Sequence, residues 1–88
     1  MKYTAIKIAV IESERGWGRK IDDWKVCLTL EDAELFRSEF NSENTETVTP
    51  DWYMAVEGDP VAIELNVNQY NKLTEEKRIW LSELNKIK

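Results

Sequence analysis

The stretch that decides the fold is YTAIKIAVIE at residues 3–12, followed by IDDWKVCLT at residues 21–29. Apolar side chains recur at every second position in both runs, which predicts two β-strands. The large apolar residues that share a face are Ile6, Ile8 and Val10 in the first run and Trp24, Val26 and Leu28 in the second. Because antiparallel neighbours share a buried side, we expect both sets to point into one core.

The segment that joins the two runs, SERGWGRK at residues 13–20, is too long for a two-residue turn. We expect Gly16 and Gly18 to take positive φ or form a bulge. The candidate binding residues of this loop are Arg15, Trp17, Arg19 and Lys20, which offer charge for an anion and a ring for stacking or for a protein interface. The alternative is that Trp17 packs on the sheet edge and the cations only keep the turn soluble.

The rest of the chain supplies material to cover this hairpin. Thr29 is placed to cap a helix that begins at Leu30 and ends in the polar residues 41–44. Residues 51–57 predict a third strand, residues 58–60 a turn, residues 61–65 a short fourth strand, and residues 66–87 a capped helix. The expected fold is a single α+β domain over residues 1–88: an antiparallel sheet of three or four strands with two helices on one face, in the order ββαβ(β)α.

Composition argues against most catalytic chemistry. The chain has no histidine and a single cysteine, Cys27, so zinc sites and histidine-dependent nucleophiles lack their residues. Asp22 and Asp23 are adjacent on a strand and point to opposite faces, so they do not converge on a metal or a substrate. We therefore expect no enzyme activity, no catalytic residue, no metal and no cofactor. No apolar run of membrane-spanning length is present, and we expect a cytoplasmic protein.

Charge is unevenly distributed along the chain. Residues 29–66 contain one cation, Arg37, and ten acids, within a total net charge of −5. The acidic surface candidates are Glu39, Glu43, Glu46, Asp51 and Asp59. Such a field repels nucleic acid and favours basic partners, so direct nucleic-acid binding is not expected. A mimic of nucleic acid is one interpretation of the acids, and an ordinary solvated surface is the other.

A second candidate surface is the sheet face that the helices leave uncovered. The residues assigned to it by alternation are Tyr3, Ala9, Ile11, Cys27 and Tyr53. This face is half apolar, which predicts either a homodimer contact or a partner surface.

Two phrases, IESERGWG at residues 11–18 and PDWYMA at residues 50–55, with LEDAE at residues 30–34 between them, resemble a family of small, mostly uncharacterised bacteriophage proteins. The resemblance covers residues 5–57 and implies a phage accessory protein expressed in a bacterial host cell. It also implies a host protein, such as an anti-phage defence component, as the partner that is bound and inhibited. It transfers no catalytic residue.

The residues and the resemblance together predict a non-enzymatic binding protein. It would act through the loop at residues 13–20 that contains Trp17, through the acidic region at residues 29–66, or through both. The alternatives are a protein that binds a nucleotide or another anion with the loop at residues 15–20, and an acidic nucleic-acid mimic.

Overall fold

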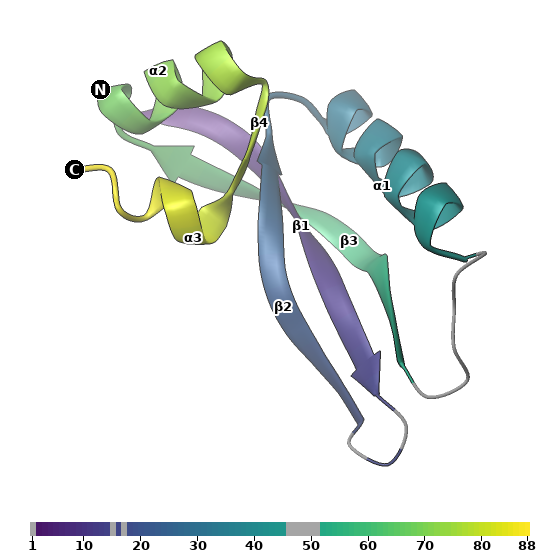
Figure 1. Cartoon of the computed structure of the whole chain (residues 1–88). Coiled ribbons are helices and arrows are strands. Elements are labelled where there is room, and N and C mark those ends of the chain that lie inside the picture. The colour runs from purple at the N-terminus through teal and green to yellow at the C-terminus, as the bar shows by residue number, and fades with distance from the viewer. Residues whose placement is uncertain (1, 15, 17, 46–51) are drawn as a thin grey trace.

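The computed structural model describes residues 2–14, 16, 18–45 and 52–88, and in this range the α+β class and the antiparallel sheet are confirmed (Figure 1). The chain runs through β1 (Tyr3–Glu14), β2 (Gly18–Cys27), α1 (Leu30–Thr45), β3 (Trp52–Leu65), α2 (Val67–Glu76), β4 (Arg78–Trp80) and α3 (Leu81–Leu84). The four strands lie in the order β3-β1-β2-β4, and every pair is antiparallel.

Several local predictions are confirmed. The Asp32 N–H donates to the Thr29 hydroxyl at 3.1 Å, so Thr29 caps α1. Asn66 and Gln69 exchange both bonds of a capping box at the start of α2. Gly16 and Gly18 take φ values of 87° and 86°, the left-handed conformation that lets the chain reverse between β1 and β2.

The sheet carries a core on each of its faces. The core beneath α1 contains Ile8, Val10, Cys27, Ala33, Phe36 and Val56. The core beneath α2 and α3 contains Ala5, Val26, Leu65, Leu73, Ile79 and Leu84. Because Val26 and Cys27 are successive residues of one strand and point in opposite directions, α1 covers one face and α2 with α3 the other.

This distribution differs from the expectation of two helices on one face and a single core. The register pairs Val26 with Lys7 and Cys27 with Ile6, so Val26 does not share a face with Ile8. The physical reason is that β1 is apolar on both sides: Ala5 and Ala9 are buried opposite the large residues. A strand that is buried on both faces lacks the alternation of polar and apolar residues that would indicate which sheet face the helices cover.

Two bulges shape the sheet. Val10 pairs with Asp23 while Ile11 pairs with Ile21, so Asp22 is an extra residue in β2. In β3 the residues 58–60, predicted as a turn, form a bulge inside one continuous strand, with Gly58 at φ 87°. The predicted third and fourth strands are therefore a single strand.

The predicted C-terminal helix is interrupted. Lys77 takes φ 74° and its N–H donates to the Leu73 carbonyl at 2.7 Å, which ends α2. Arg78–Trp80 then adds to the free side of β2 as β4, with Ile79 buried beneath the helices. Burial of Ile79 at the sheet and pairing of Arg78 with acids of α1 outweigh the helical periodicity of the sequence.

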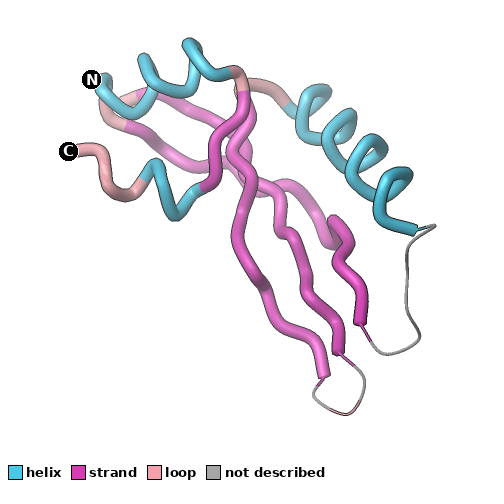
Figure 2. The backbone as a smooth tube through the Cα atoms, viewed as in Figure 1, coloured by secondary structure: helices cyan, strands magenta, loops and turns pink. Residues whose placement is uncertain are grey.

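The molecule is elongated, with extents of 46 × 23 × 19 Å. β1, β2 and β3 run on together beyond α2, α3 and the short β4 towards the turn between β1 and β2 (Figure 2). Of the helices in the described residues, none has the length and apolarity needed to cross a lipid bilayer.

Candidate binding surface

The strands beyond α2 and α3 leave part of one sheet face uncovered. Ile11 of β1 lies on the same sheet face as Ala5 and Ala9, because alternate residues of a strand point to the same side. Ile21 of β2 pairs with Ile11, and Glu57 of β3 pairs with Ala9. Ile21 and Glu57 therefore lie on this face too, as does Val26. We call this uncovered surface the open face and define it by the residues that line its hollow: Ile11, Arg19, Lys20, Ile21, Glu57 and Gly58.

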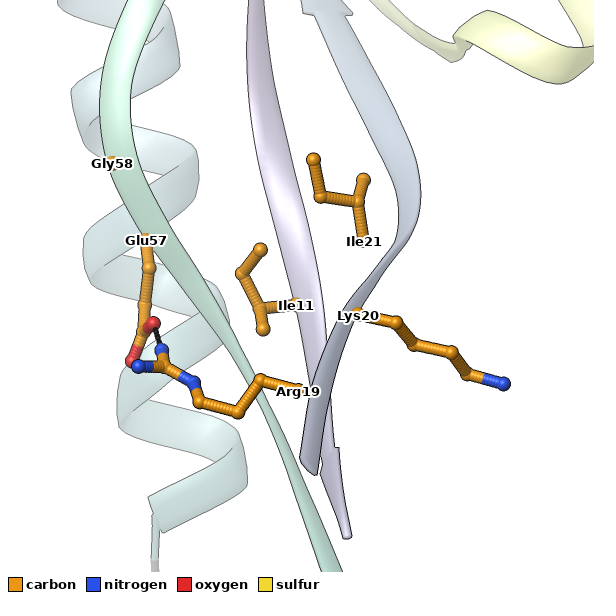
Figure 3. A pocket seen from close by; sticks show the side chains of 6 residues that line it. All are labelled: Ile11, Arg19, Lys20, Ile21, Glu57 and Gly58. Carbon is orange, nitrogen blue, oxygen red and sulfur yellow. Dashed lines mark ion pairs between the residues drawn. The ribbon is translucent and has the colours of Figure 1, made fainter. Parts of the chain in front are cut away.

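The open face combines an apolar floor with a polar rim. Ile11 is half-buried and Ile21 is 49% exposed, and the hollow has a volume of about 350 Å³. The Arg19 guanidinium reaches across β1 and forms an ion pair with the Glu57 carboxylate (Figure 3). Lys20 points away from this pair, and its ammonium lies 3.7 Å from the Glu12 carboxylate on the other side of the sheet.

The boundary between the covered and open parts of this face is fixed by Asp23 and Trp24. The Ser82 hydroxyl of α3 donates to Asp23 Oδ2 at 2.6 Å, which ties α3 to the edge of β2. The Lys7 ammonium lies 4.2 Å from the centroid of the half-buried Trp24 ring, a cation–π contact at the margin of the helices. The open face therefore begins at Ile21, two residues from Asp23, where α3 is attached.

Part of the outer edge of β3, at Val56 and Gly58, is covered by α1. Asn41 accepts from the Val56 N–H at 2.8 Å and donates to the Val56 carbonyl at 3.1 Å, so its amide replaces a neighbouring strand. Arg37 also donates to the carbonyls of Val56 and Gly58. The outer edge of β2 is different, because β4 pairs only with residues 25–27 and the described residues 18–22 have no strand on that side. Such an edge can accept another strand.

Two of the acids of α1, Asp32 and Glu39, form ion pairs within the protein. Arg78 of β4 donates to Asp32 at 2.7 Å and to Glu39 at 2.9 Å. The hydrogen bonds from Arg78 hold the pKa of Asp32 below its ordinary value. Because Asp32 and Glu39 bind β4 to α1, they are not simply available to a basic partner.

Cys27 lies under α1 and not on the uncovered face where alternation placed it. Burial, together with the negative charge of Asp32, raises the pKa of the Cys27 thiol to about 11. The thiol therefore stays protonated and enclosed, as expected of a packing residue. Tyr3 and Ala9 are also engaged: Tyr3 stacks on Tyr70 of α2 at 4.4 Å between centroids, and Ala9 is buried.

The structure brings together only some of the predicted site residues. Arg19 lies on the open face, whereas Lys20 borders the hollow but points its ammonium to the other side of the sheet, and Glu43 and Asp59 are exposed on α1 and on the β3 bulge. The predicted Arg15, Trp17, Glu46 and Asp51 lie outside the described residues, as does the side chain of Tyr53 on β3. Within the described part of the chain, no group of three or more acids or cysteines is arranged to hold a metal ion.

Sequence reasoning missed Ile21 and Glu57 as parts of this surface. Alternation along residues 21–29 places Ile21 on the opposite face from Val26. The extra residue Asp22 reverses that parity, and no signal in the sequence marks the bulge.

Comparison of the chain with models of protein families, with curated proteins and with solved structures found no match. The geometry of the open face is therefore the structural basis for a functional proposal.

Proposed function

We propose that this chain is a non-enzymatic, cytoplasmic phage accessory protein that uses the open face to bind a host protein. The observation that carries the binding proposal is the half-exposed Ile21 in a hollow of about 350 Å³. An apolar floor with a charged rim is the composition of a protein interface, in which a central apolar anchor is surrounded by polar contacts. Inhibition of the host protein, such as an anti-phage defence component, is supported by the sequence resemblance alone.

Binding through a preformed sheet face requires no rearrangement of the strands. The ion pair of Arg19 with Glu57 spans β2 and β3 across β1, and it lies beside the floor made by Ile11 and Ile21. Its side chains are 53% and 38% exposed, so both charges remain available to a partner. A partner that inserts an apolar side chain beside this ion pair would bury Ile21 and leave the pair at the rim, where its cost of desolvation is small.

The test uses two exposed aliphatic residues on different surfaces. Ile21 is 49% exposed on the open face, and Leu35 is 52% exposed on α1. Wild type, Ile21→Asp and Leu35→Asp are used as baits in bacterial lysate, and each protein that is recovered is then purified and mixed with the three baits. We expect Ile21→Asp to lose the partner while Leu35→Asp retains it. Equal recovery by all three baits, or no partner that binds the purified wild type, would contradict the proposal.

The alternative is a protein that binds an anion, for which Arg19 supplies a cation at the hollow, whereas the Lys20 ammonium points to the other side of the sheet. Against it, Arg19 is already paired with Glu57, which would have to be displaced or would repel the anion. Thermal unfolding with a panel of nucleotides separates the two functions, since a ligand at 100 times its dissociation constant adds about 2.7 kcal/mol of stability. We expect no shift for any nucleotide.

A further inference from the structure

We propose that two copies of this chain pair through the outer edge of β2, with Ile21 of one copy opposite Ile21 of the other. This interaction shares Ile21 with the host-protein contact proposed above, and it is measured as self-association in the absence of any host protein. It concerns the strand edge of residues 18–22, which faces neither α1 nor the two other helices that cover the sheet.

The outer edge of β2 is unpaired over residues 18–22 in the described structure. β2 is hydrogen-bonded to β1 along its inner side from Gly18 to Cys27, but on its outer side only residues 25–27 are paired, with β4. Figure 1 shows the lower part of β2 running free past α3 towards the turn. On the opposite edge of the sheet, Arg37 and Asn41 of α1 bind backbone groups of Val56 and Gly58 in β3. The outer edge of β2 at residues 18–22 has no such cover in the described structure, so its strand is available for pairing.

The charges along this edge are complementary to those of a second copy of the same edge. The sequence around the centre is Lys20-Ile21-Asp22. In an antiparallel pair centred on Ile21, residue 20 of one copy lies opposite residue 22 of the other, so a lysine meets an aspartate twice. Pairing of the same segments in parallel would set lysine against lysine and aspartate against aspartate. The charge pattern therefore selects the antiparallel, twofold arrangement that is usual for homodimers.

The side chains involved are free to take part. Lys20 is 74% exposed, and its 3.7 Å contact with Glu12 leaves donors of the ammonium for a second acceptor. Asp22 is exposed, and its side chain has no hydrogen bond or ion pair among the described residues. Ile21, half-exposed in one copy, would pack on its own counterpart, because residues directly opposite in such a pair have Cβ atoms about 5 Å apart.

The extra residue Asp22 restricts which strands can add to this edge. A bulge increases the local twist and interrupts regular pairing, which discourages addition of an arbitrary flat strand. A second copy carries the same bulge at the same distance from the central Ile21, so the two distortions are related by the symmetry axis. The twofold axis stands perpendicular to the sheet, and the two open faces would therefore lie on the same side of one eight-stranded sheet.

Charge-swap complementation tests this pairing. Wild type, Lys20→Glu, Asp22→Lys, the double variant carrying both changes, and an equimolar mixture of the two single variants are compared by sedimentation equilibrium over a concentration series. Each single variant sets like charges opposite one another at two places, so we expect its dimer dissociation constant to rise at least about tenfold. The double variant and the mixture restore opposite charges at both places and recover the dimer.

Two controls keep the net charge of each single variant but change it elsewhere. Lys86→Glu and Glu75→Lys alter exposed positions away from β2 and should dimerise as wild type does. Circular dichroism checks that every variant is folded, which the exposure of residues 20 and 22 favours. A wild type that is monomeric at every concentration would overturn the proposal. So would a dimer that the single variants leave unchanged, or one that the mixture fails to restore.

Discussion

Val26 and Ile21 are β-branched residues of the same strand and the same sheet face, yet one is fully buried and the other is 49% exposed. The difference is made by α2 and α3, which cover Val26 and end near Asp23, where Ser82 of α3 is attached. The covered part of this face is a core that holds the fold together. The open part is supported by strand pairing and by the α1 core behind it, so its residues are free to serve a binding role.

The largest expected difference between the covered and open parts is in how much the same substitution, isoleucine to alanine, lowers the free energy of unfolding. Ile79 is 3% exposed beneath α2 and α3, and Ile21 is on the open face. Ile79→Ala should lower the free energy of unfolding by about 2–5 kcal/mol, because it removes buried methyl groups and leaves a cavity. Ile21→Ala should lower it by less than about 1 kcal/mol. Urea unfolding measures both, and similar losses for the two variants would show that the open face is part of the core.

A second contrast concerns the ion pairs of the two parts. Arg78 joins β4 to Asp32 and Glu39 of α1 and lies 5.6 Å from the Phe36 ring, with 22% of its side chain exposed. Arg19 of the open face is 53% exposed. We expect Arg78→Ala to cost about 1–2 kcal/mol in urea unfolding and Arg19→Ala about 0–1 kcal/mol. A larger loss of unfolding free energy for Arg19→Ala than for Arg78→Ala would mean that the open face contributes more to stability than the ion pairs of Arg78.

The third and smallest effect is on the pH dependence of stability. Arg78 lowers the pKa of Asp32 below its ordinary value of 3.8, so the folded protein binds this proton less readily than the unfolded chain. The resulting stability is present above that ordinary value and is lost as the pH falls through the lower, folded pKa. Asp32→Asn should therefore flatten the acid side of the stability profile below the ordinary carboxyl pKa of 3.8, measured by urea unfolding. Identical profiles for Asp32→Asn and wild type would refute this role.

Local rules in the sequence were sufficient for the capped helix starts at Thr29 and Asn66 and for the two glycines of the first turn. They were insufficient wherever tertiary contacts decide. The spacing of apolar residues over 66–87 is compatible with one helix and with the observed α2, β4 and α3. Pairing of β4 with the edge of β2 favours a strand at Ile79. Helical propensity is a weak preference that such burial readily overrides.

The candidate site could be predicted only in part, for a related reason. Arg19 and Lys20 were found because cations beside glycines are conspicuous in a sequence with an excess of acids. Ile21 was assigned to the wrong neighbours because a single extra residue reverses the alternation of a strand. Glu57 is brought to Arg19 by pairing of β1 with β3, a contact between segments far apart in the chain.

The most direct test of the open face as a binding surface is a pair of dissociation constants. The partner recovered with wild type is titrated against Ile21→Asp and Leu35→Asp, which add the same charge at equally exposed aliphatic positions. A half-buried anchor that becomes charged should weaken binding at least tenfold, so we predict that ratio or more for Ile21→Asp and a value near wild type for Leu35→Asp. Equal dissociation constants for the two variants would contradict the account.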